Sequence, residues 1–83
     1  SPNNPVVLNN YGLTLALDRQ FDRALARLEA ARAAVNARDR RRYATISLNM
    51  ALVQGISGDL DGAEQTAKPF LSEPQLYNNL GLY

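Results

Sequence analysis

Asparagine recurs at one place in three similar segments of the chain. The segments are 9–13 (NNYGL), 48–52 (LNMAL) and 78–82 (NNLGL), and the shared residues are Asn10, Asn49 and Asn79. A side-chain amide offers two donors and an acceptor, which suits the N–H and C=O groups of an extended peptide. Asn is a mediocre helix residue, so its recurrence inside helices needs a reason. Two reasons stay open: contact with a bound peptide, or a structural role at solvated positions or in bonds to a neighbouring helix.

Arginine residues form the second group that could carry a binding function. The basic excess of the chain peaks at Arg38, Arg40, Arg41 and Arg42, although the net charge is only +1. Such a cluster suits an acidic partner, a phosphate or a membrane surface, and its effect would weaken steeply with salt. The alternative is a solvated loop and helix end. Only Tyr43 supplies a neighbouring aromatic platform, so we expect no nucleic-acid binding.

The side chains that usually carry catalysis are missing from the sequence. There is no His, no Cys and no glycine-rich phosphate loop. The carboxylate pairs Asp18/Asp22 and Asp59/Asp61 stand at turns, where helix capping explains them. Carboxylates alone could hold a metal, and no clustered set of them is present. We therefore expect a chain that is not an enzyme and has no metal site and no cofactor.

Length and composition bound the rest. Eighty-three residues make one small domain, and an apolar content of 46% argues against disorder. No apolar run approaches the roughly 20 residues of a transmembrane helix. The first residue is Ser1 rather than an initiator Met, so we expect a fragment in which the missing targeting signals mean little.

The hydrophobic pattern predicts five helices and no strands. Asn4, Asp39 and Asp59 can cap helix starts, and Gly58 is placed to end a helix. Pro69 should kink or stop the fourth helix near residues 67–68. The expected helices cover about residues 5–18, 21–36, 40–57, 60–67 and 75–83. Short connections make consecutive helices antiparallel neighbours.

Small residues recur where pairs of these helices would cross. Gly12 and Gly81 are separated by about two periods of the ~34 residues of a helix–turn–helix repeat. Ala51 takes the place of the glycine in the middle segment, and Ala24 and Ala63 are the small residues of the second helices. Small residues at these points allow close helix crossing, with large residues filling the remaining space.

The first repeat unit carries a family signature. A tetratricopeptide repeat has a large apolar residue, Leu-Gly, an aromatic, Ala, an aromatic and Pro at fixed offsets. These places are taken by Leu8, Tyr11, Gly12, Leu15, Ala24 and Leu28, with Asn36 where Pro is usual. The second unit is weaker, because Ala67 is small and Phe70 large where the reverse is usual. The third unit is a first helix only, matched at Tyr77, Leu80 and Gly81.

The chain therefore resembles the tetratricopeptide family over nearly its whole length. The resemblance implies an all-α fold of antiparallel helix–turn–helix repeats in a right-handed solenoid. It divides a single domain, 1–83, into repeats at about 5–38 and 40–72 and a lone final helix at about 73–83. A plain antiparallel helical bundle is the alternative.

A narrower resemblance rests on residues 48–55 (LNMALVQG), 58–60 (GDL), 63–64 (AE) and 79–83 (NLGLY). These segments are similar to the tetratricopeptide lipoproteins of tight-adherence (Tad/Flp) pilus assembly. That family is bacterial, secreted and anchored at the outer membrane. Membership would imply a scaffold of a secretion machine in the periplasm or at the outer membrane. Otherwise a cytoplasmic location is expected.

The family resemblance also implies a binding site. First helices line a concave groove, so Asn10, Asn49 and Asn79 would form a ladder there, with Asn9 and Asn78 beside it. An apolar floor would come from Leu13, Leu52 and Leu82. The places where some relatives clamp a terminal carboxylate hold no basic residue; they are Asn9, Leu13, Asn49, Gln75 and Asn79.

The expected partner is therefore a protein or an extended or helical apolar peptide, without a carboxylate clamp. The alternative is a structural segment that self-associates or packs on the rest of its own chain. That alternative draws on the last helix, because Leu76 and Leu80 would lie uncovered where repeat arrays usually need a polar cap.

Overall fold

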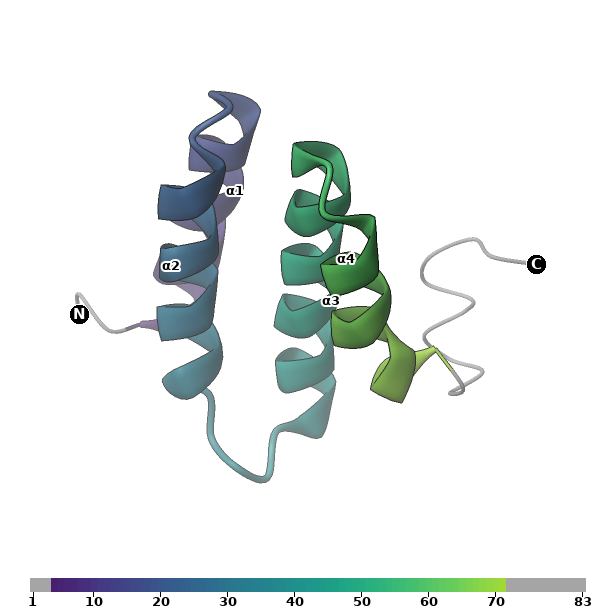
Figure 1. Ribbon diagram of the computed structural model, residues 1–83. Coiled ribbons are helices and arrows are strands. Elements are labelled where there is room, and N and C mark those ends of the chain that lie inside the picture. The colour runs from purple at the N-terminus through teal and green to yellow at the C-terminus, as the bar shows by residue number, and fades with distance from the viewer. Residues whose placement is uncertain (1–3, 72–83) are drawn as a thin grey trace.

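The computed structural model describes residues 4–71, which form an all-α fold (Figure 1). The elements are α1 (Pro5–Leu17), α2 (Phe21–Ala33), α3 (Arg40–Ser57), α4 (Leu60–Ala67) and a 3₁₀ turn, η1 (Lys68–Phe70). Strands are absent from this described range, as expected. The sequence predicted five helices for the whole chain, whereas residues 4–71 contain four. The fifth, predicted at 75–83, lies outside the described residues.

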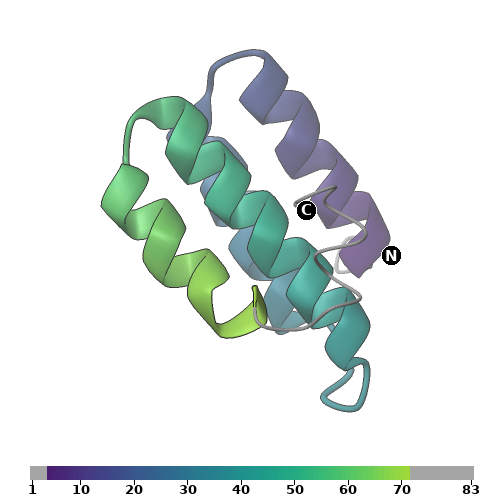
Figure 2. The ribbon, with the colours of Figure 1, turned by 90° about the vertical axis from the view of Figure 1, so that its right-hand side faces the viewer.

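The helices form two antiparallel hairpins. α1 packs on α2, α3 packs on α4, and α2 packs on α3 to join the hairpins, while α1 meets α3 through a smaller contact. Consequently α1 and α3 run in the same direction (Figure 2). The two hairpins fall within the sequence ranges predicted for the two repeats, 5–38 and 40–72.

Within residues 4–71, each helix start that the sequence predicted from a capping residue is confirmed. The Asn4 Oδ1 atom accepts the backbone N–H groups of Val6 (2.9 Å) and Val7 (3.4 Å) at the start of α1. Asp39 caps α3 and Asp59 caps α4 in the same way, each accepting a backbone N–H near 3 Å. These side chains satisfy donors that the first turn of a helix leaves without partners.

The helix ends follow from local chemistry. Gly58 ends α3 with a φ of +102°, a conformation that side chains disfavour. α4 stops at Ala67, and Pro69 lies in the 3₁₀ turn that follows, as predicted. α2 ends at Ala33, and its predicted end at residue 36 is wrong. There the Oδ1 atom of Asn36 accepts the backbone N–H of Arg38 (2.9 Å), a local bond that competes with helix continuation.

The core lies where the three longest helices, α1, α2 and α3, pack together. Its large side chains are Leu8, Leu15, Leu28, Ile46, Met50 and Val53. Small residues lie where α1 and α2 approach each other: Gly12 and Ala24 are buried, and a Cβ on Gly12 would lie only 2.8 Å from Leu28 Cγ. The predicted role of small residues in close crossing is therefore confirmed for this hairpin.

Candidate functional site

One hydrogen bond links the two parallel helices α1 and α3. The Nδ2 atom of Asn49 donates to the Oδ1 atom of Asn9 over 3.0 Å, and both side chains are half-buried. We call these two residues the amide pair. The pair forms because Leu8 and Leu15 turn one face of α1 toward the core, and Asn9, one residue after Leu8, lies about 100° round the helix from it.

The structure pairs Asn49 with Asn9 and not with Asn10. Asn10 lies a further step round α1 and is exposed, and its carbonyl oxygen accepts the hydroxyl of Thr14 at 2.9 Å. Asn49 therefore has a structural bond to a neighbouring helix, one of the two roles that the sequence left open. The other predicted groove residues Asn78, Asn79 and Leu82 lie outside the described range.

Apolar side chains lie beside the amide pair. Leu13 follows Asn9 by one turn of α1 and is half-buried. On α3, Leu52 is 57% exposed, although it is a large aliphatic residue. Leu48 and Ile56 stand one turn before and after it, and we call these three residues the apolar strip. Leu52 and Ile56 are exposed and Leu48 is half-buried, so the strip leaves apolar surface in contact with water that a partner could cover.

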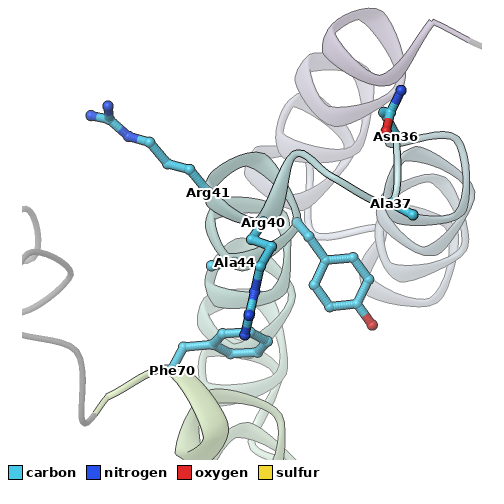
Figure 3. A pocket seen from close by; sticks show the side chains of 7 residues that line it. Asn36, Ala37, Arg40, Arg41, Ala44 and Phe70 are labelled. Atoms are coloured by element: carbon cyan, nitrogen blue, oxygen red, sulfur yellow. The ribbon is translucent and has the colours of Figure 1, made fainter.

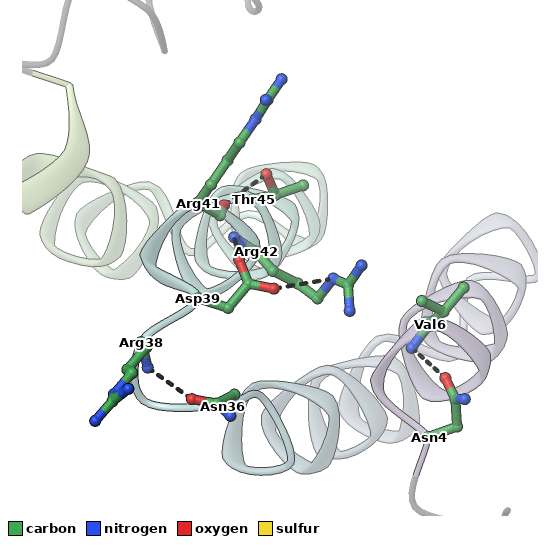
Figure 4. A network of polar contacts seen from close by, with 8 residues as sticks. All are labelled: Asn4, Val6, Asn36, Arg38, Asp39, Arg41, Arg42 and Thr45. Atoms are coloured by element: carbon green, nitrogen blue, oxygen red, sulfur yellow. Dashed lines mark hydrogen bonds and ion pairs between the residues drawn. The ribbon is translucent and has the colours of Figure 1, made fainter.

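The predicted arginine cluster lies at the joint between α2 and α3 (Figure 4). Arg42 lies 3.7 Å from Asp39 through its Nε atom, and the same carboxylate caps α3. Arg38, Arg40 and Arg41 are exposed. Within residues 4–71, only Arg42 of this cluster lies within ion-pair distance of a carboxylate. The cluster thus carries positive charge that the described part of the chain does not neutralise.

Two cavities adjoin this joint, and neither is lined by the amide pair. The larger, about 830 Å³, lies between the α2–α3 loop, the start of α3 and η1. The smaller, about 380 Å³, lies between α2, α3 and α4. Tyr43 and Phe70 line both, with ring centroids 6.1 Å apart and ring planes 52° from parallel. Gln54 lines the smaller cavity, and its Oε1 atom is buried without a hydrogen-bond partner in the described chain.

Sequence reasoning missed the contacts that hold this aromatic pair. The guanidinium of Arg32 lies 5.2 Å from the Tyr43 ring centroid, and its Nη1 atom donates to the Oγ atom of Ser47 over 3.1 Å. Ser47 is fully buried. The only signal in the sequence was the exchange of large and small residues at Ala67 and Phe70, which puts an aromatic ring where an alanine is usual. That signal did not indicate Tyr43 as its neighbour.

Residues 4–71 contain neither a cluster of metal ligands nor a membrane-spanning helix. No group of three or more His, Cys, Asp or Glu residues comes together there in a way that could hold a metal ion. In the same part of the chain, every helix is too short or too polar to span a bilayer.

Comparisons with known proteins find no match: no protein-family model, no curated protein and no solved structure is significantly similar to this chain.

Proposed function

We propose that this chain is a non-catalytic protein-interaction module of the tetratricopeptide type. Its hairpins would stack as a right-handed solenoid, and a peptide or protein segment would bind along the face that α1 and α3 share. The observation that carries the proposal is the amide pair, because it links the parallel first helices of two successive hairpins. The apolar strip and Leu13 flank the same face.

The hydrogen bond of the amide pair is compatible with peptide binding. It uses one donor hydrogen of Asn49 and one acceptor site of Asn9. Each Asn side chain has two N–H donors and a carbonyl oxygen, so both hydrogens of Asn9 and the oxygen of Asn49 stay available. A bound backbone would use these groups, while the aliphatic side chains of the apolar strip would contact apolar peptide side chains.

A display library of random peptides would test the proposal. Peptides selected on the immobilised chain would be measured by isothermal titration calorimetry with three proteins: the parent, Leu52→Asp and Val7→Asp. Val7 is a matched control because it is 56% exposed, close to the 57% of Leu52. It lies about 160° round α1 from Asn9, since successive residues are 100° apart.

We expect the library to yield apolar peptides. Their affinity for Leu52→Asp should be at least tenfold lower than for the parent, and their affinity for Val7→Asp should stay within twofold, with unchanged thermal unfolding in both variants. A tenfold loss corresponds to about 1.4 kcal/mol, which burial of one aliphatic side chain can supply. Equal loss in both variants, or none in either, would overturn the proposal.

The second candidate function is a structural or oligomerisation segment. It is favoured by the continuation of exposed apolar residues past the apolar strip, since Leu60 at the start of α4 is 70% exposed. Sedimentation equilibrium distinguishes the two. A mass that rises with concentration in the parent and stays monomeric in Leu52→Asp would favour self-association, and a monomer at all concentrations would exclude it.

A narrower proposal is a scaffold role in bacterial tight-adherence pilus assembly, in the periplasm or at the outer membrane. It is supported by the sequence segments alone. In that setting the groove would extend to Asn78, Asn79 and Leu82.

A further inference from the structure

The larger cavity has the size of a ligand site and lies apart from the amide pair. Its volume of about 830 Å³ falls in the range of ~300–1,000 Å³ typical of small-ligand pockets. It is bordered by the loop that ends α2, the first turn of α3 and the 3₁₀ turn η1 (Figure 3). The lining residues used below are Asn36, Arg40, Arg41, Tyr43 and Phe70.

The aromatic wall of this cavity is held by its neighbours. Tyr43 and Phe70 meet in a tilted pair, and the guanidinium of Arg32 stacks on the Tyr43 ring at 5.2 Å. Arg32 is fixed in turn by its bond to the buried hydroxyl of Ser47. Tyr43 is nevertheless 42% exposed, so part of its apolar surface faces solvent. An apolar ligand group would recover that surface from water.

The rim of the cavity is basic. Arg40 and Arg41 are both exposed, and Figure 3 shows Arg41 extended outward and Arg40 lying across the view of the Phe70 ring. The nearest acid in sequence, Asp39, already caps α3 and lies beside Arg42. Within residues 4–71 neither Arg40 nor Arg41 lies within ion-pair distance of a carboxylate. A ligand that brings carboxylates would therefore meet two guanidinium groups suited to them.

Asn36 adds a neutral donor. Its Oδ1 atom accepts the backbone N–H of Arg38, which fixes the side chain and leaves the two Nδ2 hydrogens for another acceptor. A peptide carbonyl is such an acceptor. The cavity thus combines an aromatic wall, a basic rim and an amide donor.

We propose that this cavity binds an acidic peptide segment in which a large apolar side chain stands between carboxylates. The apolar side chain packs against Tyr43 and Phe70, and the flanking carboxylates pair with Arg40 and Arg41. A long polyanion fits less well, because the net charge of the chain is only +1 and the basic excess peaks at one short cluster, residues 38–42. This site is separate from the proposed groove and stands without it.

The test uses a defined probe, the peptide acetyl-Asp-Glu-Phe-Glu-Asp-amide, titrated into the whole chain at low salt and followed by calorimetry. Two control peptides replace the acids by their amides or the Phe by Ala. We expect the acidic peptide to bind and each control peptide to bind at least tenfold more weakly. Affinity should fall as salt rises, because exposed charges are screened.

Charge-matched variants locate the site. Arg40→Gln and Arg41→Gln should each lower the affinity of the acidic peptide at least fivefold. Arg38→Gln removes the same charge from the loop just before α3, and Arg38 lies outside the cavity lining, so the affinity of this variant for the acidic peptide should stay within twofold. Phe70→Leu should lower affinity while keeping an apolar residue. Thermal unfolding followed by circular dichroism identifies any variant whose loss comes from unfolding.

Four results would overturn the proposal. One is equal binding of the acidic and amide peptides. Another is an equal loss in Arg38→Gln and Arg41→Gln, which indicates a general basic surface. A third is tighter binding of oligouridylate or of phosphatidylglycerol vesicles than of the peptide. The last is a dimer that Arg41→Gln dissociates in the absence of peptide binding, which would assign the cavity to a second copy of the chain.

Discussion

Gly12 on α1 and Leu28 on α2 are so close that a Cβ atom on Gly12 would lie 2.8 Å from the Cγ atom of Leu28. The added Cβ atom would also lie 3.1 Å from the carbonyl oxygen of Ala24. Leu28 is fully buried, so it has little room to move. The separation of α1 and α2 is therefore set by the absence of a side chain at one position.

The first prediction concerns that position. In Gly12→Ala, overpacking should cost about 1–3 kcal/mol, and the better helix propensity of Ala should return about 1 kcal/mol. The free energy of unfolding should therefore fall. Gly55→Ala is the matched control, because its Cβ would lie 3.8 Å from the Ala63 Cβ, an ordinary contact. It should raise the free energy of unfolding by up to about 1 kcal/mol. Urea denaturation measures both, and a stabilised Gly12→Ala would show that the helices separate freely.

A second prediction concerns the core. Leu28→Ala should lower the free energy of unfolding by about 2–5 kcal/mol, since it leaves a cavity in a fully buried site. That loss approaches the whole stability of a small domain, so Leu28→Met, expected to cost under about 1.5 kcal/mol, gives a measurable intermediate. Leu17→Ala is the control, because Leu17 is 88% exposed. A shift in Leu17→Ala beyond about 0.5 kcal/mol would contradict the assigned exposure.

The third prediction separates capping from charge at the start of α3. Asp39→Ala should lower the free energy of unfolding by about 1 kcal/mol, because the backbone N–H of Arg42 loses its acceptor. Asp39→Asn keeps an acceptor oxygen and should stay close to the parent. The ion pair with Arg42 is exposed and contributes little. If thermal melts show the same loss of stability in Asp39→Asn and Asp39→Ala, the effect comes from the charge instead.

The fourth prediction measures the amide pair. Asn9→Ala and Asn49→Ala should each destabilise the fold, and a double-mutant cycle should give a coupling of about 0.5–1.5 kcal/mol between them. Asn10→Ala is the control. Its side chain is exposed, and Ala is the better helix former, so stability should be unchanged or slightly raised. A coupling near zero in chemical denaturation would mean that the bond does not hold the hairpins together in solution.

Features that depend on neighbouring residues could be predicted from the sequence. Asn4, Gly58 and Pro69 each act on the backbone within a few residues, and each has the predicted effect on a helix start or end. The end of α2 could not be predicted from periodicity, because it depends on a local turn that the side chain of Asn36 forms with the backbone N–H of Arg38. Leu60 at the start of α4 is 70% exposed although it is a large aliphatic residue, because burial depends on which helix lies opposite.

Features of the site that depend on three-dimensional contact could not be predicted. Periodicity indicates that Asn9 and Asn49 lie on helices, but only the packing of α2 on α3 brings these two residues together. The aromatic wall has the same origin, since Tyr43 and Phe70 belong to separate elements. The arginine cluster was visible in the sequence, whereas the cavity beside Arg40 and Arg41 was not.

The separation of Asn9 and Asn49 along the chain also bears on the order of folding. Most packing in residues 4–71 joins consecutive helices, whose contacts close short loops and form quickly. The amide pair connects positions 40 residues apart. We expect each hairpin to form first and the bond between α1 and α3 to form late, after the transition state. Removing it should then speed unfolding while leaving the refolding rate nearly unchanged.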